Sequence, residues 1–386
     1  MMKKTFLANA LVLLGSIISP TSFAGAVSSS DNLVGYMSLE DPLVRPIGIS
    51  VKSDGTMIVT AAGDLFQESD SGQIWTASPG STKFYKNVIS PETHEINILT
   101  SSAYSESHDS LYVCSIPAPE LATNIAPAVI EFKKNEAGEY VWTSVMNFQE
   151  GTLQCCKGIS IIGNTLFALN PLYSSPKTPA LYAADLAEPE SSRKLAVIQT
   201  YGDLGFSDDD TWDQSPLSMA ISDITTSKSP QKDSNYHLYL LDVTHSKIDS
   251  VVFGKGKNVD DMDRISIEQM PFDGDTIKSP TALASLDNKN FFISGSIDVS
   301  RYNAVNHELA TIYKLTYRDN NPSPKMSLLG EEYSTIAEMI ISKDRFNKGI
   351  GNSLFATLVT QDSKGVYNVA EYRIDSNEKT NHASSK

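Results

Sequence analysis

An acidic cluster in the middle of the chain is the densest set of side chains that can do chemistry. Asp208, Asp210 and Asp213 lie close together in a long connection that also carries Trp212. Carboxylates at this spacing can surround a calcium ion, although the glycine and the distal glutamate of an EF-hand loop are missing. The cluster therefore indicates either a calcium site or a solvated acidic loop.

The histidines are spread along the chain and form no HExxH pair or closely spaced metal-binding set. No Gly-x-Ser-x-Gly elbow, P-loop or dinucleotide fingerprint is present, so the sequence gives no support to serine hydrolysis or nucleotide chemistry. We single out His94 and Glu95, because they open a predicted inner strand. Side chains at such positions line the pocket of a ring of sheets.

The three cysteines are Cys114, Cys155 and Cys156. An odd number leaves one thiol without a partner. We assign a disulfide to Cys114 and Cys155, and keep Cys114 with Cys156, a vicinal Cys155–Cys156 ring and free buried thiols as alternatives. The assignment expects an oxidising compartment.

Short β-rich runs bounded by Gly, Pro, Asn, Asp and Ser recur along the whole chain, and helical periodicity is almost absent, so the class is all-β. The clearest unit starts at Pro46 with a strand, an Asp54-Gly55 turn and a second strand. Two further strands are expected at 64–68 and 73–77. Similar units begin near residues 95, 157, 216, 280 and 336, and expected third strands lie at 128–132, 180–184, 311–315 and 369–373.

This spacing fits one four-stranded blade per unit, so we predict a six-bladed β-propeller. The last unit lacks a fourth strand, whereas residues 33–39 form an unassigned strand near the other end. We predict that this N-terminal strand completes the last blade and so hides two sheet edges. A seven-bladed ring and an open β-solenoid are the alternatives.

The stretch from Pro46 to Val59 resembles an NHL-type repeat. The blade order is similar to that of the six-bladed propeller superfamily that includes regucalcin/gluconolactonase, arylesterase and strictosidine-synthase-like proteins. The resemblance rests on propeller-strand features of most of the chain after its first 24 residues, so it speaks to fold more than to chemistry. The segments that carry it are 216–221, 238–245, 279–283, 291–293 and 336–342.

Enzymes of that superfamily hold a divalent cation, usually calcium, on carboxylate and amide side chains of the inner strands. In this chain Ile47 stands where the first glutamate is expected, and Thr281-Ala282 stands where an Asn-Asp pair is expected. Glu338 lies one residue away from another ligand position. The resemblance therefore implies a calcium-dependent hydrolase or lactonase only if the metal has been re-sited.

The start of the chain reads as a secretory signal peptide over residues 1–24. Lys3 and Lys4 precede an apolar stretch over residues 6–18, which is too short for a bilayer span, and Ala24 offers a cleavage site. Cleavage after Ala26 and a retained anchor are the alternatives. We expect a periplasmic or secreted protein with one propeller domain, residues 25–374, and a disordered polar tail, residues 375–386.

The formal net charge of −15 opposes non-specific attraction to nucleic acid and to anionic lipid. We therefore predict a monomer that inserts into no membrane and takes a protein, peptide or glycan ligand as a non-catalytic binding scaffold. The calcium-dependent hydrolase or lactonase is the competing hypothesis, and the sequence does not decide whether the chain is an enzyme. The residues expected to line the channel mouth in either case are Arg45, His94, Glu95, Lys157, Ser215, Ser279 and Glu338.

Overall fold

The structure is a computed structural model of the chain. It describes residues 31–41, 45–62, 72–89, 98–116, 128–148, 156, 158–170, 179–200, 202–205, 218–221, 235–243, 245–254, 259, 262–277, 280–295, 310–319, 321–342, 352–359 and 361–374. The regular structure of this part is β-strand apart from two short 3₁₀ helices, η1 (Glu190–Ser192) and η2 (Gly202–Leu204), so the predicted all-β class is confirmed. None of the described helices is long and apolar enough to cross a membrane.

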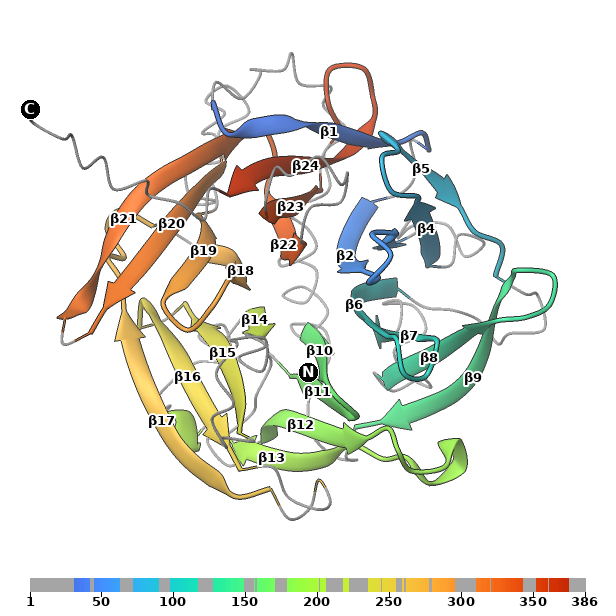
Figure 1. The fold of residues 1–386 in the computed structure, drawn as a ribbon, viewed down its shortest axis with the longest axis horizontal. Helices are drawn as coiled ribbons and strands as arrows, with labels where there is room; N and C mark the ends of the chain where they lie inside the picture. The colour runs from blue at the N-terminus through green and yellow to red at the C-terminus, as the bar shows by residue number, and fades with distance from the viewer. Residues whose placement is uncertain are drawn as a thin grey trace, which may run out of the picture.

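Four sheets have four strands each, paired in chain order from the centre of the molecule outward (Figure 1). Their strands are β6 (Ile98–Ser105), β7 (Ser110–Ile116), β8 (Ala128–Lys134) and β9 (Tyr140–Asn147); β10 (Gly158–Ile162), β11 (Thr165–Leu169), β12 (Pro179–Asp185) and β13 (Ala196–Thr200); β14 (Ser218–Ile221), β15 (Tyr236–Asp242), β16 (Lys247–Phe253) and β17 (Arg264–Pro271); and β18 (Pro280–Ser285), β19 (Asn290–Gly295), β20 (Ala310–Arg318) and β21 (Asn321–Glu332).

The remaining sheet has eight strands in the order β2-β3-β4-β5-β1-β24-β23-β22. These are β1 (Leu33–Leu39), β2 (Arg45–Val51), β3 (Met57–Ala62), β4 (Gln73–Ala77), β5 (Lys83–Lys86), β22 (Ile336–Ser342), β23 (Asn352–Leu358) and β24 (Tyr367–Ile374). It consists of two four-stranded halves joined edge to edge, because β1 and β5 pair in parallel through only Ser38 with Lys83 and Leu39 with Phe84.

Figure 1 shows the sheets arranged radially around a common axis, with β2, β6, β10, β14, β18 and β22 innermost. Antiparallel sheets in this arrangement form a β-propeller. We call these six innermost strands the inner wall. Each junction between neighbouring sheets, or sheet halves, holds an apolar cluster that includes fully buried side chains such as Phe167, Leu240, Phe291 and Phe355. Burying one such side chain stabilises the fold by about 1.5–3 kcal/mol.

The N-terminal strand pairs with the last described strand of the chain, as predicted. Strand β1 pairs antiparallel with β24 from Leu33 opposite Tyr372 to Leu39 opposite Tyr367. Glu332 at the end of β21 adds a second tie, because its carboxylate accepts hydrogen bonds from the hydroxyls of Tyr36, at 3.2 Å, and Tyr372. Strands from both ends of the described chain and the neighbouring sheet therefore meet at one buried carboxylate.

The first predicted unit is right in its hairpin and wrong in the place given to residues 73–77, whereas the expected strand at 64–68 lies outside the described residues. Gly55 has a φ of 83°, and the carboxylate of Asp54 accepts a hydrogen bond from the Thr56 N–H, so the turn forms as expected. Gln73–Ala77 pairs directly with β3 and is the third strand, not the fourth. The fourth strand is Lys83–Lys86, whose two lysines hide it from a pattern search. All four expected third strands at 128–132, 180–184, 311–315 and 369–373 are present.

Candidate functional site

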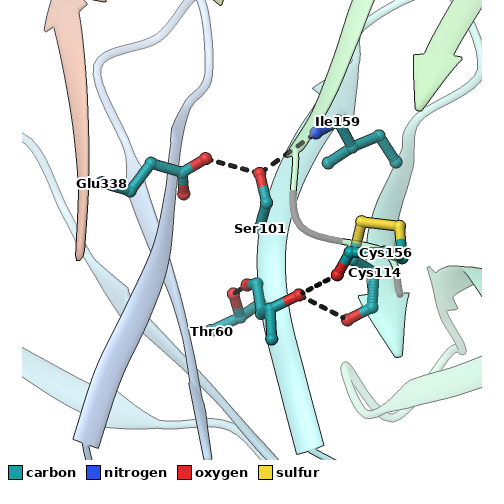
Figure 2. Close-up of a disulfide and its surroundings, with 7 residues drawn as sticks. Thr60, Ser101, Cys114, Cys156, Ile159 and Glu338 are labelled. Carbon is teal, nitrogen blue, oxygen red and sulfur yellow. Dashed lines mark hydrogen bonds between the residues drawn. A yellow bond between two sulfur atoms is a disulfide. The ribbon is translucent and has the colours of Figure 1, made fainter. Parts of the chain in front are cut away.

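Glu338 is the inner-wall carboxylate that the sequence singled out, and it lies on β22. Its Oε2 accepts a hydrogen bond of 2.7 Å from the backbone N–H of Ile49 on β2. Its Oε1 accepts a hydrogen bond of 2.5 Å from the hydroxyl of Ser101 on β6 (Figure 2). The carboxylate thus bonds with both oxygens to neighbouring strands of the inner wall.

Ser101 extends this connection to a fourth strand. Its hydroxyl donates to Glu338 and accepts a hydrogen bond of 3.2 Å from the backbone N–H of Ile159 on β10, as Figure 2 shows. One side-chain pair therefore links β22, β2, β6 and β10, which belong to consecutive sheets or sheet halves of the ring. Charge-assisted hydrogen bonds of this kind are among the stronger ones in proteins, so the pair fixes the spacing of these strands.

Close backbone approach accompanies these bonds. A Cβ atom on Gly48 would lie 2.0 Å from the carbonyl oxygen of Thr100 and 2.2 Å from Oγ1 of Thr60. The Thr60 hydroxyl donates to that same Thr100 carbonyl. Because no side chain fits between β2 and β6 at this point, the glycine lets the two inner strands come together.

A disulfide joins Cys114 on β7 to Cys156, which precedes β10, with the two Cα atoms 5.2 Å apart. Both residues are fully buried, and the hydroxyl of Thr100 donates a 3.0 Å hydrogen bond to the Cys156 carbonyl. The assignment of Cys155 as the partner is therefore wrong, and the alternative pairing with Cys156 is the one observed. Adjacent cysteines give loops that differ by one residue, so the sequence could not separate them; Cys155 itself lies outside the described residues.

Arg45 is the first residue of β2 and is partly buried. Its Nη1 atom is shielded from solvent and has no hydrogen-bond partner among the residues that the structure describes. Within the described part of the chain, no ion pair joins Arg45 to Glu338. The Glu338 carboxylate bonds to Ile49 and Ser101 instead.

The inner-wall residues at the superfamily's ligand positions do not fit calcium. Ile47 is apolar and almost fully buried. The Thr281 hydroxyl pairs with that of Ser294 at 2.8 Å, and the Ala282 N–H donates to the same Ser294 oxygen. With both Glu338 oxygens engaged, these positions offer no set of oxygen ligands of the kind that calcium takes.

The remaining predicted site residues lie outside the described part of the chain. They are His94, Glu95, Lys157, Ser215 and Ser279 at the expected channel mouth, and Asp208, Asp210 and Asp213 of the acidic cluster. Within the described ranges, no group of three or more His, Cys, Asp or Glu side chains is placed to hold a metal ion.

A cluster that the sequence reasoning missed surrounds the hairpin turn between β15 and β16. Asp242, fully buried, accepts hydrogen bonds from the backbone N–H of His245 at 3.1 Å and, with Oδ2, from its Nδ1 at 2.8 Å. Lys247 Nζ lies 3.5 Å from Oδ2 of Asp242 and 3.2 Å from Oδ1 of Asp249. The signal was the sequence Asp-x-x-His-x-Lys-x-Asp, in which a turn brings alternate polar residues onto one face.

Asp249 of this cluster is a buried carboxylate with an unusual lack of hydrogen-bond donors in the described part of the chain. Its carboxylate is fully buried, and neither oxygen has a hydrogen-bonding donor in good geometry among the described residues. Burial raises the pKa of Asp249 to about 6, with the nearby Asp242 charge acting in the same direction and the Lys247 ammonium opposing it. Perturbed carboxyl groups of this kind occur both at active sites and in structural ion networks.

The comparisons with known proteins agree on the fold alone. No family model matches the chain, and no curated protein sequence matches it. Among solved structures, a calcium-containing structure of a Trichoderma reesei protein of carbohydrate-active enzyme family AA12 is similar at a TM-score of 0.50 and 10% identity, covering 92% of this chain and 100% of that one.

Two further solved structures are similar at lower TM-scores. A Bacteroides thetaiotaomicron protein of unknown function has a TM-score of 0.49 at 8% identity, over 91% of this chain and 73% of that one. A catalytically inactive virginiamycin B lyase from Staphylococcus aureus, in complex with quinupristin, has a TM-score of 0.46 at 10% identity, over 88% and 99%.

Proposed function

We propose that this chain is an exported, six-bladed β-propeller that serves as a binding scaffold and takes a protein, peptide or glycan ligand at the mouth of its inner wall. The observation that carries the proposal is the engagement of Glu338. Its two oxygens bond to Ile49 and Ser101, so the carboxylate that the superfamily resemblance brings closest to a ligand position serves to hold the ring together. A rigid ring that presents loops is a common binding architecture.

The six-blade count rests on how the eight-stranded sheet is divided. Strands β2–β5 form one antiparallel half, and β22, β23, β24 and β1 form the other. Only two residue pairs join the halves, and an apolar cluster with Ile49, Trp75 and Phe355 packs between them as it would between two blades. Each half thus has the four strands of one blade.

Export is supported by two independent features. A buried disulfide between Cys114 and Cys156 is typical of proteins that fold in an oxidising compartment. The pattern of residues 1–24 fits a cleaved signal peptide, as the sequence analysis argued. Together they favour a periplasmic or secreted location for a domain that starts near residue 25.

Glycan and peptide arrays probed with the labelled mature chain test the binding function. The scaffold proposal expects a defined ligand class that also raises the thermal stability of the chain, because a ligand that binds only the native state stabilises it. Arrays without a reproducible signal, combined with measurable turnover of any ester or lactone, would overturn the proposal.

A hydrolase is the second candidate, and the pair formed by Asp242 and His245 favours it. A buried carboxylate fixes the orientation of an imidazole that is 37% exposed, as in general-base catalysis. The metal of such an enzyme would bind at Asp208, Asp210 and Asp213 instead of at the inner wall. This candidate expects calcium-dependent hydrolysis of lactones or esters that is lost in both His245→Gln and Asp208→Asn; a wild-type chain without such activity eliminates it.

A further inference from the structure

We propose that Arg45 anchors an oxyanion group, a carboxylate or a phosphate, of the ligand that binds at the inner wall. The inference rests on the proposed binding function and deepens it, because it names the chemical group that the site recognises. It starts from a guanidinium nitrogen, Nη1 of Arg45, that is shielded from solvent and has no acceptor in the described part of the chain.

Apolar residues lie next to Arg45 on the inner wall. Arg45 opens β2, and its partner across the strand ladder is Ala62. Ala62 and Ile47 belong to an apolar cluster with Ile98 of β6, against which Ala337 of β22 also packs. The buried cluster members are 1–5% exposed, so this stretch of the inner wall is apolar.

A guanidinium with an N–H shielded from solvent needs an acceptor more than any other charged side chain does. A buried lysine or carboxylate can lose its charge by titration, but arginine stays protonated at every physiological pH. Burial of its N–H without an acceptor therefore has a cost in free energy that only a bound partner removes. The Glu338 carboxylate does not fill this role, because it accepts from Ile49 and Ser101.

Arg193 shows how this chain treats a buried arginine whose role is structural. Its Nη1 donates to the carboxylate of Glu131 at 2.8 Å and to the hydroxyl of Tyr112 at 3.1 Å. Its Nη2 and Nε donate to the backbone carbonyls of Leu186 and Glu188, both at 2.9 Å. All three nitrogens of Arg193 are satisfied within the protein, whereas Nη1 of Arg45 has no acceptor among the described residues.

The geometry of the guanidinium selects the ligand chemistry. Its planar fork matches two oxygens of one carboxylate or phosphate group and forms parallel charge-assisted hydrogen bonds. The net charge of −15 disfavours general accumulation of anions around the molecule, so binding of an oxyanion requires a local site of this kind.

Thermal unfolding of the mature chain in sodium phosphate, sodium acetate and sodium chloride at equal ionic strength tests the inference. We expect the midpoint to rise with the concentration of phosphate or acetate and not with chloride, and the more effective of the two identifies the preferred oxyanion. Arg45→Gln should abolish this rise and weaken calorimetric binding of the same ion at least tenfold. Arg318→Gln, which removes an equal charge from an exposed position, should keep the full response.

Two further measurements separate an anchoring role from a structural one. Without oxyanions, Arg45→Gln should be at least as stable towards urea as wild type, because it removes an N–H without an acceptor; a clear loss of stability would overturn the inference. Arg45→Lys, which keeps the charge but not the fork, should bind the oxyanion more weakly than wild type. Equal midpoint shifts in wild type and Arg45→Gln would also overturn it.

The array ligand distinguishes this inference from the scaffold proposal. A ligand that binds wild type and Arg45→Gln equally would leave the scaffold standing and refute the role of Arg45. An oxyanion response that depends on Arg45, in a chain that binds no array ligand, would support the anchor and refute the scaffold.

Discussion

Glu332 should make the protein less stable as the pH rises through neutrality, which is the opposite of ordinary acid denaturation. The carboxylate is fully buried on β21, and only the hydroxyls of Tyr36 and Tyr372 donate to it in the described structure. Burial raises the pKa of Glu332 to about 7, and the two tyrosine hydrogen bonds oppose the rise only in part. The folded state therefore favours the protonated, neutral carboxyl group.

The sign of the pH dependence follows from the protons bound in each state. Between the unfolded pKa of 4.5 and the folded pKa of about 7, the native chain holds a proton that the unfolded chain has released. The free energy of unfolding thus falls as the pH rises across this window and levels off above it. The difference between the two pKa values corresponds to about 3 kcal/mol.

Urea unfolding of wild type and Glu332→Gln between pH 5 and pH 8 measures this contribution. Gln keeps the shape of the side chain and can accept one tyrosine hydrogen bond and donate another, but it does not titrate. Relative to wild type, Glu332→Gln should gain up to about 3 kcal/mol on going from pH 5 to pH 8. Asp249, whose pKa burial raises to about 6, acts in the same direction and cancels in this comparison.

Glu331→Gln is the matched control, since it changes the neighbouring, partly exposed carboxylate on the same strand. Glu331→Gln leaves Glu332 and its two tyrosine hydrogen bonds in place, so it should not reproduce the pH-dependent gain expected of Glu332→Gln. A pH-independent difference between wild type and Glu332→Gln, or a wild type that gains stability relative to the variant as the pH rises, would refute the reasoning.

Three further predictions concern ties within the ring. Ser101→Ala should lower the free energy of unfolding by about 1–3 kcal/mol in urea titrations, because it leaves buried hydrogen-bonding groups of the inner wall unpaired; stability equal to wild type would contradict this. Cys114→Ser should cost about 2–4 kcal/mol, whereas Cys155→Ser should leave the disulfide intact in non-reducing peptide maps. Arg193→Ala should cost about 3–5 kcal/mol by removing the cation closest to the buried Glu131, and a loss below 1 kcal/mol would argue against that ion pair.

Hairpin turns and third strands could be predicted because they depend on local patterns. Gly55 of the Asp54-Gly55 turn has a positive φ, and the third strand at residues 128–132 is buried throughout. Strand β5, Lys83–Lys86, escaped prediction because its pairing partners, and not its own residues, make it a strand.

The site was harder to predict because its contacts join distant residues. Nothing near Ser101 in the sequence indicates that it donates to Glu338, which is 237 positions away. The choice between Cys155 and Cys156 depends on which side of the chain faces β7, and adjacent residues cannot reveal that. Arg45 was singled out by its place at the start of an inner strand. Only the structure shows that its Nη1 atom has no acceptor among the described residues.

Thermal unfolding of wild type and Glu338→Gln, each with calcium and with a chelator, tests the central claim most directly. Glu338 bonds to two neighbouring strands as a structural tie of the proposed scaffold. Glu338→Gln should therefore unfold at a lower temperature than wild type even with the chelator present, and calcium should not widen the difference. The contradicting result is that calcium raises the unfolding temperature of wild type by several degrees but does not change that of Glu338→Gln. This result would show that the carboxylate holds a metal.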